Sequence, residues 1–404
     1  DIDELNYFKT TIDDEIINGT SVFFDKSLDI INQRTVLTEQ YFEEILNQPM
    51  DFSNEEIVDF GDEIPYTKSE EELKDRWRKY LKYSVLTRLH ADLLAQEKSI
   101  ENKDTSFTLK SIDTLQAIAR RSVLKTHRDW YKRINRLDRK DRLAVYANSI
   151  TTVYDPHTNY FPPEQKEDFD IQMSGRLEGI GAQLQEKDGY IKITNIIPGG
   201  PSSLQGELQA NDLILKVAQE GKEPVEIIDW RISDAVKIIR GPKGSKVTLT
   251  VRKPDGNEKD ITIIRDIVVL EETYAKSLIL SDEDKIKAGY IYLPSFYADF
   301  QNPQGRFSWK DVKKEVEKLR DEKVKGIILD LRNNGGGSLD DVVKMSGLFI
   351  DKGPIVQVKE KGRSAQILED RYAGAEWEGP LVIMVNEFSA SASEIMAAAM
   401  QDYD

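Results

Sequence analysis

The sequence predicts a multidomain α+β protein with a helical first part, a small β-rich part and an α/β last part. Three observations predict this order. A chain of 404 residues is too long for one ordinary hydrophobic core. Apolar residues recur every three or four positions up to about residue 161, and short β-rich runs between Gly, Pro, Asn and Asp follow. After about residue 267, strands alternate with Gly-containing loops and helices.

The first part, residues 1–165, is predicted to be a helical domain. Its clearest segment is "LKDRWRKYLKYSVLTRLHADLLAQ", which predicts a long amphipathic helix. Five apolar residues are expected to share its buried face: Trp77, Tyr80, Leu81, Val85 and Leu89. The prolines of "YDPHTNYFPPEQ" break the helical pattern, so the domain is expected to end nearby.

Two further domains are predicted, over residues 166–266 and 267–404. The first combines strands such as "YIKITNIIP" and "KVTLTVRKPDG" with one helix at residues 229–240. The second twice repeats the order strand, loop, helix, in "KGIILDLRNNGGGSLDDVVKMSGLF" and "GPLVIMVNEFSASASEIMAAAMQ". This order predicts a mostly parallel sheet with functional loops at the carboxyl ends of its strands.

Composition excludes several classes of function. The formal net charge of -16 argues against a nucleic-acid partner, which requires clustered Lys and Arg in excess. The absence of cysteine excludes disulfides and thiol catalysis, and three histidines far apart in sequence make a metal site improbable, so neither a metal nor a cofactor is expected. No apolar run approaches the roughly 18 residues of a membrane span.

Three glycines, Gly335, Gly336 and Gly337, follow the buried strand of "ILDLRNNGGGS" and precede a helix. Glycines permit positive φ and expose backbone N–H groups, which together with the helix dipole form an anion site. The anion could be a phosphate, a carboxylate or a developing oxyanion, and a tight turn without a ligand is the simpler reading. The pattern matches neither a Walker A loop nor a dinucleotide-binding turn.

The segment "LEGIGAQLQ" carries a second glycine pair. The amides around Gly179, Ile180, Gly181 and Ala182 could form a nest for a terminal carboxylate. The strand that follows could pair with an extended peptide, and the helix at residues 229–240 would form the other wall of that groove.

Three serines two apart, Ser389, Ser391 and Ser393, lie between an apolar strand and a helix. A serine at this position could be a nucleophile whose oxyanion is stabilised by the helix N-terminus. Ser391 also fits the capping box S-x-x-E with Glu394, a purely structural role. Spacing alone does not choose among the three serines.

No base is evident for such a nucleophile. The histidines lie outside the α/β part, and a pair with His157 would require the fold to bring the turn "DPHTNY" back to the serines. A lysine base would need its pKa lowered from about 10.4 toward about 7 or 8 by burial, and most lysines here lie in charged runs.

Together, four motifs resemble the carboxyl-terminal processing proteases, most closely the tail-specific group. They are "DPHTNYFPPEQKEDFDIQMSGRLEGIGAQL", "RGPKGSKVTLTV", "IILDLRNNGGGSL" and "FSASASEIMAAAMQDY", in the family's order and spacing over about residues 150–404. The resemblance implies a PDZ domain embedded in a crotonase-like α/β serine protease core, with a Ser-Lys dyad. One departure is Asn211, where PDZ domains usually have glycine, and asparagine tolerates the left-handed conformation.

The resemblance also assigns roles to residues. It places the nucleophile on Ser391, and the oxyanion donors on Ala392 and on Gly336 with Gly335 beside it. Asp402 matches an acidic residue associated with the active site, and Arg240 would sense docking on the PDZ domain, although a turn-facing charge is an equal alternative. The family's lysine lies in a Gly-Lys-Gly motif roughly two dozen residues after the serine. It is therefore expected beyond Asp404, in a longer protease of which this chain is a fragment.

The expected function is thus a serine endopeptidase that recognises protein C-termini, with free, apolar tails of proteins or peptides as substrates. An adaptor protein is a further expected partner, and the resemblance implies a periplasmic or otherwise extracytoplasmic location. The alternative is a non-catalytic PDZ adaptor on a protease-like scaffold. A crotonase-like acyl-CoA enzyme would use the same Gly loop but leaves the PDZ domain unexplained.

Overall fold

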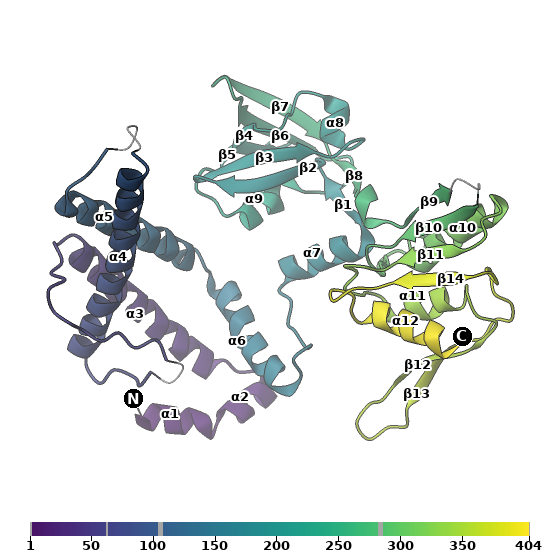
Figure 1. Cartoon of the computed structure of the whole chain (residues 1–404), viewed down its shortest axis with the longest axis horizontal. Helices are drawn as coiled ribbons and strands as arrows, with labels where there is room; N and C mark the ends of the chain where they lie inside the picture. The colour runs from purple at the N-terminus through teal and green to yellow at the C-terminus, as the bar shows by residue number, and fades with distance from the viewer. Residues whose placement is uncertain (1, 62–63, 104–107, 282–285, 404) are drawn as a thin grey trace. The chain divides into compact units, whose positions relative to one another are not determined.

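The computed structural model describes residues 2–61, 64–103, 108–281 and 286–403. The chain divides into two compact units, Asp1–Pro162 and Pro163–Asp404, and each is described here by itself. The first unit is helical, as the sequence predicts, and the second contains every described strand (Figure 1).

The core of the first unit lies among three long helices, α3, α4 and α5, where Phe42, Leu81 and Leu115 are buried. Ser69 caps α4, because its Oγ accepts a hydrogen bond from the N–H of Glu72 at 3.2 Å. The helices of this unit are α1 (Ile2–Lys9), α2 (Ile12–Asn18), α3 (Val22–Leu46), α4 (Glu70–Glu101), α5 (Ile112–Asn135) and α6 (Arg139–Tyr154).

The predicted face of α4 is mostly confirmed. Leu81, Val85 and Leu89 are buried, and Trp77 packs against the same core, whereas Tyr80 is 42% exposed. Positions 77, 81, 85 and 89 are spaced by four and form one stripe, so Tyr80 lies at the margin of that stripe.

The second unit begins with α7 (Pro163–Ser174) and continues into a six-stranded antiparallel sheet. Its strands run in the order β2-β3-β4-β6-β7, with β5 paired to β4. Every second side chain of β3 and β6 points into one buried core, among them Ile191, Ile193, Val247 and Leu249. The elements are β2 (Ala182–Lys187), β3 (Tyr190–Ile196), α8 (Pro201–Gln205), β4 (Leu213–Gln219), β5 (Val225–Glu226), α9 (Ile232–Ile239), β6 (Lys246–Arg252) and β7 (Glu258–Ile264).

A two-stranded antiparallel ribbon joins this sheet to the rest of the unit. It consists of β1 (Arg176–Gly179) and β8 (Asp266–Val269), with Gly179 opposite Asp266. The chain enters β1 at Gly175, whose φ is +67° and whose Cα packs on the Tyr274 ring, where a Cβ would come within 2.7 Å. Only glycine fits such a turn without displacing the aromatic ring.

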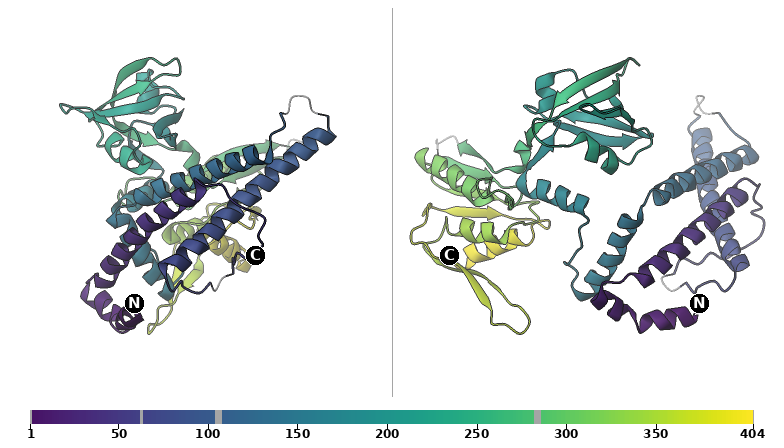
Figure 2. Two further views of the ribbon diagram at one scale, coloured as in Figure 1. Left: turned by 90° about the vertical axis from the view of Figure 1, so that its left-hand side faces the viewer. Right: turned by 180° about the vertical axis from the view of Figure 1, so that it is seen from behind.

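The last part of the unit is built on a four-stranded sheet in the order β14-β11-β10-β9. Three neighbouring strands, β10, β11 and β14, are parallel, so the predicted mostly parallel sheet is confirmed. The hairpin β12–β13 projects from this part, as Figure 1 and the right-hand view of Figure 2 show. The elements are β9 (Lys276–Ser281), β10 (Lys287–Tyr292), α10 (Ser308–Asp321), β11 (Ile327–Asp330), α11 (Leu339–Ser346), β12 (Gly353–Val358), β13 (Gln366–Asp370), β14 (Leu381–Met384) and α12 (Ala392–Asp402), with a 3-10 turn η1 (Glu271–Thr273) before β9.

Candidate active site

Two loops meet at one edge of the four-stranded sheet. They are the Gly loop, which contains Gly335, Gly336 and Gly337, and the serine turn, which runs from Asn386 to Ser391. Strands β11 and β14 are parallel neighbours, with Asp330 opposite Met384 at their carboxyl ends. The Gly loop follows β11, and the serine turn follows β14. Because carboxyl ends of parallel strands share an edge, the two loops are brought together, as the strand order in the sequence predicts.

Ser391 is the exposed serine of the three and has an unusual backbone. It is the N-cap of α12, with φ 54° and ψ −114°, outside the regions that non-glycine residues commonly occupy. A backbone of this kind costs about 1–3 kcal/mol and persists only where the surrounding structure enforces it. Such strain is concentrated at active sites, where it holds a side chain in a working position.

Ser391 and Glu394 form the capping box that the sequence predicts. The carboxylate of Glu394 accepts a hydrogen bond from the N–H of Ser391 at 2.7 Å. Ser391 Oγ faces the N–H of Glu394 in return, in a looser geometry than a full hydrogen bond. The cap uses this oxygen only as an acceptor, and within the described ranges its O–H has no acceptor, so the hydroxyl can still act as a nucleophile.

The other two serines are held in structural hydrogen bonds. Ser389 Oγ donates to the carbonyl of Leu331 at 2.8 Å and accepts from the N–H of Asn386 at 3.0 Å. Ser393 is fully buried, and its Oγ donates to the carbonyl of Asn334 at 2.8 Å. Burial and bonding thus separate Ser391 from its two neighbours, which the spacing in the sequence could not do.

Gly336 packs directly on the nucleophile candidate. A Cβ at position 336 would lie 2.8 Å from Ser391 Cβ and 2.9 Å from the carbonyl oxygen of Ala390, and the φ of Gly336 is +104°. Gly337 is equally restricted, since a Cβ there would meet the carbonyl oxygen of Phe296 at 2.3 Å. Gly335 has open space around it. Two of the three glycines are therefore required by close packing, whereas the sequence pattern allowed an anion site or a tight turn without a ligand.

Asn334 is a buried residue that sequence reasoning missed. Its Nδ2 donates to the carbonyl of Leu293 at 2.9 Å, and its Oδ1 accepts from the N–H of Gly336 at 2.9 Å. Its own carbonyl accepts from the N–H of Ala390 at 3.1 Å and from Ser393 Oγ. Asn334 therefore fastens the Gly loop to the serine turn. Its position before three glycines was the only sequence signal.

A second asparagine pair supports the same junction. The Asn333 N–H donates to Asn386 Oδ1 at 2.8 Å, and Asn386 Nδ2 donates to Asn333 Oδ1 at 2.9 Å. Asn333 has φ 62°, a left-handed conformation that asparagine tolerates better than most residues. Amide side chains thus join the loop after β11 to the segment that leads into Ser391.

The amides around Ser391 differ in whether they are already bonded. The N–H of Gly336 is taken up by Asn334 Oδ1. Within the described ranges, the N–H groups of Gly335 and Ala392 have no hydrogen-bond acceptor. Ala392 is the first residue of α12, so its amide also carries the positive end of the helix dipole. Because Ala392 directly follows Ser391, its N–H suits a developing oxyanion at this serine, and Gly335 has the unbonded N–H of the neighbouring loop.

No base lies against Ser391 in the described part of the chain. No hydrogen bond joins its Oγ to a lysine or histidine among those residues. His157 lies in the other unit, in an exposed turn where its N–H donates to Asp155 Oδ1. Asp402 is at the far end of α12, about 16 Å along the helix axis from Ser391. The structure therefore does not bring Asp402 into contact with Ser391.

Two buried carboxylates support the loops of this site. Asp330, at the end of β11, accepts hydrogen bonds from the guanidinium of Arg332 and from Tyr290 Oη, and these lower its pKa to about 2. Asp341, in the first turn of α11, accepts from Ser338 Oγ at 2.9 Å and Ser308 Oγ at 3.0 Å, while burial raises its pKa. Both residues brace the start or end of the Gly loop.

The residues predicted to hold a peptide tail lie together beside β2 and α9. Ile180 is buried, and its carbonyl accepts from the N–H of Ser202 at 2.8 Å. Gly181 has φ +73° and approaches the Cα of Gly200, where a Cβ would come within 3.2 Å. In the part of the chain that is described, the N–H groups of Ile180 and Gly181 have no acceptor. The loop therefore presents two free amides at the end of an edge strand.

The rest of this groove follows from the fold. Strand β2 is at the edge of the six-stranded sheet, and α9 packs beside it. Ala182 and Leu184 of β2 and Ile232 of α9 are partly buried apolar residues at this position. Asn211, in the glycine position of PDZ domains, has φ 77°, so the expected left-handed conformation is confirmed.

Arg240, directly after α9, is held by carboxylates of α7. Its guanidinium pairs with Asp168 at 3.0 Å and with Glu167 at 3.5 Å. Its Cγ lies 3.7 Å from the position that a Cβ on Gly179 would occupy, so the side chain packs beside the loop of residues 179–182. Arg240 thus lies beside α7 and the loop at Gly179, and its role in sensing a docked peptide stays a prediction.

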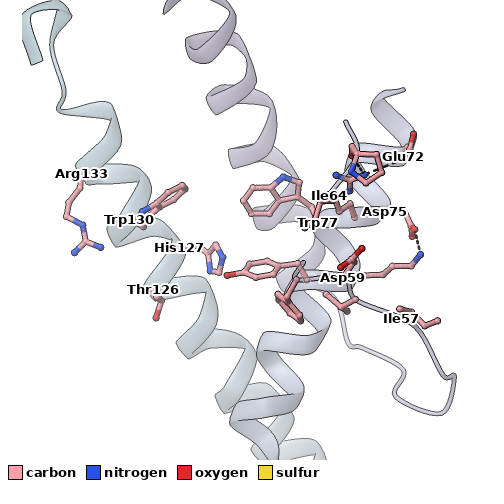
Figure 3. Close-up of a pocket in the computed structure, with 16 residues that line it drawn as sticks. Ile57, Asp59, Ile64, Glu72, Asp75, Trp77, Thr126, His127, Trp130 and Arg133 are labelled. Atoms are coloured by element: carbon pink, nitrogen blue, oxygen red, sulfur yellow. Dashed lines mark hydrogen bonds and ion pairs between the residues drawn. The ribbon is translucent and has the colours of Figure 1, made fainter. Parts of the chain in front are cut away.

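The first unit contains a separate hollow of about 810 Å³ between α4, α5 and the segment around Phe60. Trp77, His127 and Trp130 line it (Figure 3). His127 Nδ1 lies 2.9 Å from the carbonyl of Val123, which accounts for that ring nitrogen. The described residues that line it include no serine and therefore provide no Ser-His pair.

No helix among the described residues is long and apolar enough to cross a membrane. Those residues also contain no group of three or more His, Asp or Glu side chains arranged to hold a metal ion.

Three sequence families match the chain in the order of its parts. The tail specific protease N-terminal domain matches residues 1–164, the PDZ domain residues 168–252, and peptidase family S41 residues 287–404. The tail-specific protease of Haemophilus influenzae is 31% identical over 407 residues, covering 100% of this chain and 54% of that protein. The carboxy-terminal processing protease CtpA of Bacillus subtilis is 36% identical over 279 residues, covering 68% of this chain and 54% of that protein.

Solved structures of similar proteins cover parts of the chain. The PDZ domain of a carboxy-terminal protease from Vibrio cholerae, in complex with peptide, is 44% identical, with a TM-score of 0.23, and covers 23% of this chain and 97% of that one. The photosystem II D1 C-terminal processing protease is 21% identical, with a TM-score of 0.34, and covers 66% of this chain and 68% of that one. This chain spans about half the length of the two curated relatives. With these three domains in this order, the chain belongs to the carboxyl-terminal processing protease family, in its tail-specific group.

Proposed function

We propose that this chain belongs to a serine endopeptidase that holds the free C-terminus of a protein in its PDZ groove and cleaves with Ser391. The observation that carries this proposal is the contrast among the three serines. Ser391 is exposed and strained, and among the described residues its O–H has no acceptor, whereas Ser389 and Ser393 donate their hydroxyl protons within the turn. The match to peptidase family S41 over residues 287–404 supports the same reaction class.

The chemistry follows from the groups around Ser391. Its Oγ attacks the carbonyl carbon of the scissile peptide bond and passes its proton to a neutral base. The tetrahedral oxyanion accepts hydrogen bonds from the N–H of Ala392 and from the Gly loop, where Gly335 has the free amide and Gly336 provides the close packing. The protonated base then donates to the leaving amine, and water hydrolyses the resulting acyl-enzyme.

We assign the base to a lysine. The family resemblance puts it roughly two dozen residues after the serine, and therefore beyond Asp404. A lysine is a base only when neutral, so its pKa has to fall from about 10.4 toward about 7 or 8, as burial against an apolar surface would cause. The role of Asp402 in this site is indirect, because α12 carries it away from Ser391.

The PDZ groove is proposed to select apolar tails with a free carboxylate. The free N–H groups of Ile180 and Gly181 would donate hydrogen bonds to the terminal carboxylate, and the edge of β2 would pair with the extended tail. Ala182, Leu184 and Ile232 offer apolar surface to the last side chains. Arg240 would add a positive charge next to the loop of residues 179–182.

Two further expectations accompany this proposal. We place the protein outside the cytoplasm, which fractionation of the source cells with a marker enzyme for each compartment would test. We also expect an adaptor protein to deliver some substrates, which affinity capture of the Ser391→Ala protein would test. Neither affects the assignment of the nucleophile.

The test compares the full-length protein with Ser391→Ala and with the control Ser389→Ala on one peptide that bears a free or an amidated C-terminus. We expect cleavage of the free peptide by the full-length protein, loss of at least about 10³-fold in kcat for Ser391→Ala, and most activity kept in the control. Tail binding without any cleavage would instead support the non-catalytic PDZ adaptor. Unchanged cleavage by Ser391→Ala would eliminate Ser391 as the nucleophile.

A further inference from the structure

Arg265 is a buried arginine at the point where β7 ends and β8 begins. Only 2% of its surface is exposed. Its guanidinium donates hydrogen bonds to Ile239 O at 2.8 Å, Ile238 O at 3.0 Å, Gln219 Oε1 at 2.8 Å, Ser245 Oγ at 3.0 Å and Lys246 O at 3.2 Å. All three guanidinium nitrogens are therefore hydrogen-bonded, as a buried charge requires.

The partners of Arg265 are unusual for a buried charge. Among the described residues, no carboxylate forms an ion pair with it. Two of its acceptors, Ile238 O and Ile239 O, are carbonyls at the C-terminal end of α9, where the helix dipole is negative. Gln219 Nε2 donates to Ile238 O as well, at 2.7 Å. The end of α9 is thus fastened by two side chains from outside the helix.

The backbone of Arg265 ties two other segments to the same point. Its N–H donates to Ser245 O at 2.8 Å, and its carbonyl accepts from the N–H of Gly244 at 2.7 Å. The next residue, Asp266, lies opposite Gly179, where the loop of residues 179–182 begins. Gly241 packs on the guanidinium, where a Cβ would come within 3.0 Å. Arg265 therefore joins three segments: the end of α9, the turn that follows it, and the β1–β8 ribbon that leads into the loop of residues 179–182.

We propose that Arg265 is a positioning residue that holds the C-terminal end of α9 against the β1–β8 ribbon and thereby sets the spacing of the peptide groove. The groove lies between α9 and β2, so a displaced α9 end would move one wall away from a tail bound along the other. The inference rests on the proposed function, because that function makes this groove the tail site. It adds a determinant of tail affinity that makes no contact with the tail.

The experiment uses the full-length protein with Arg265→Met, Arg265→Lys and Gln219→Leu. Arg252→Met is the matched control, since Arg252 lies on β6 of the same sheet and its guanidinium pairs with Glu258 at 3.1 Å and lies against the Tyr190 ring, with no hydrogen bond to α9 among the described residues. Affinity for a fluorescent peptide with an apolar free C-terminus is measured in the Ser391→Ala background. KM and kcat are measured with the serine intact, on free and amidated peptides.

The expected result is a split between binding and chemistry. Arg265→Met weakens tail affinity at least tenfold and raises KM for the free peptide, while kcat stays within twofold. Arg265→Lys, which keeps the charge but fewer donors, has an intermediate effect, and Gln219→Leu a smaller one in the same direction. The amidated peptide and the Arg252→Met protein are unaffected.

Unchanged tail affinity in Arg265→Met would overturn the inference, as would a fall in kcat that is equal for both peptides. If Arg265→Met does not fold, as judged by thermal unfolding, Arg265→Lys and Gln219→Leu decide by the same criteria. If the unaltered protein binds no tail, the proposed function fails, and amide hydrogen exchange then tests Arg265 separately. Faster exchange at the end of α9 in Arg265→Lys would support the positioning role, and unchanged exchange would remove it.

Discussion

Gly336 lies against Ser391 so closely that a Cβ at position 336 would come within 2.8 Å of Ser391 Cβ. The contact explains why the Gly loop and the serine turn form one site, and why the loop needs glycine there. It also makes the geometry of Ser391 sensitive to the smallest added side chain.

Gly336→Ala is therefore expected to lose at least about 10²-fold in kcat, because the methyl group displaces Ser391 and the helix end behind it. The positive φ adds a stability loss of about 1–3 kcal/mol. Gly335→Ala is the matched control, since its surroundings are open and its φ is not positive. Kinetics and thermal unfolding of the two full-length variants check this, and equal activity in both would contradict the packing argument.

Asn334→Ala is expected to lower both stability and activity. It removes a buried side chain that binds Leu293 O and the Gly336 N–H, at a cost of about 1–3 kcal/mol for the polar groups left unpaired. It also frees the Gly336 amide. We expect a loss of about 10²-fold in kcat that exceeds any change in KM. A variant with lower melting temperature but unchanged kcat would show that Asn334 supports only the fold.

The stability of the protease part is expected to fall in acid through Asp330. Its folded pKa of about 2, caused first by Arg332, is below the ordinary value of about 3.9. A lowered carboxyl pKa stabilises the fold above the unfolded pKa, by about 2.6 kcal/mol here, and this stabilisation disappears as pH falls from about 4 to about 2. Denaturant unfolding of the wild type and of Arg332→Met across that range checks this. Parallel loss in both proteins would contradict the assignment.

Arg240→Ala is expected to raise KM about tenfold for a free C-terminus and to leave an amidated peptide unchanged. Its ion pairs with Asp168 and Glu167 are exposed on the carboxylate side, so stability should fall by less than about 1 kcal/mol. Asp168→Ala is the control, because it breaks the closer ion pair and keeps the guanidinium. Equal rises in KM for the two variants would assign the effect to the ion pair.

The order of domains, the parallel sheet and the meeting of the two loops could all be predicted from the sequence. They follow from periodicity and from the strand, loop and helix order, which are local properties. The choice of Ser391 over Ser389 and Ser393 required the family resemblance, because hydrogen bonds to Leu331 and Asn334 distinguish the serines only after folding.

Other parts of the site depend on contacts between segments far apart in sequence. Asn334 and Ser391 are 57 positions apart, and nothing local to Asn334 indicates that its carbonyl will bind the serine turn. The hydrogen bond from the Gly336 N–H to Asn334 Oδ1 could not be predicted from the sequence either. This bond leaves the N–H of Gly335 as the unbonded donor of the Gly loop. In the sequence, Arg265 is an arginine at the end of a predicted strand, and nothing nearby indicates that it is buried at the end of α9.

The most direct test of Ser391 as the nucleophile is covalent trapping. The full-length protein is treated with a serine-directed phosphonate, and the modified peptide is identified by mass spectrometry. We expect one adduct, on Ser391, in proportion to lost activity, and no adduct in Ser391→Ala. An adduct on Ser389 or Ser393, or full activity with Ser391 modified, would contradict it.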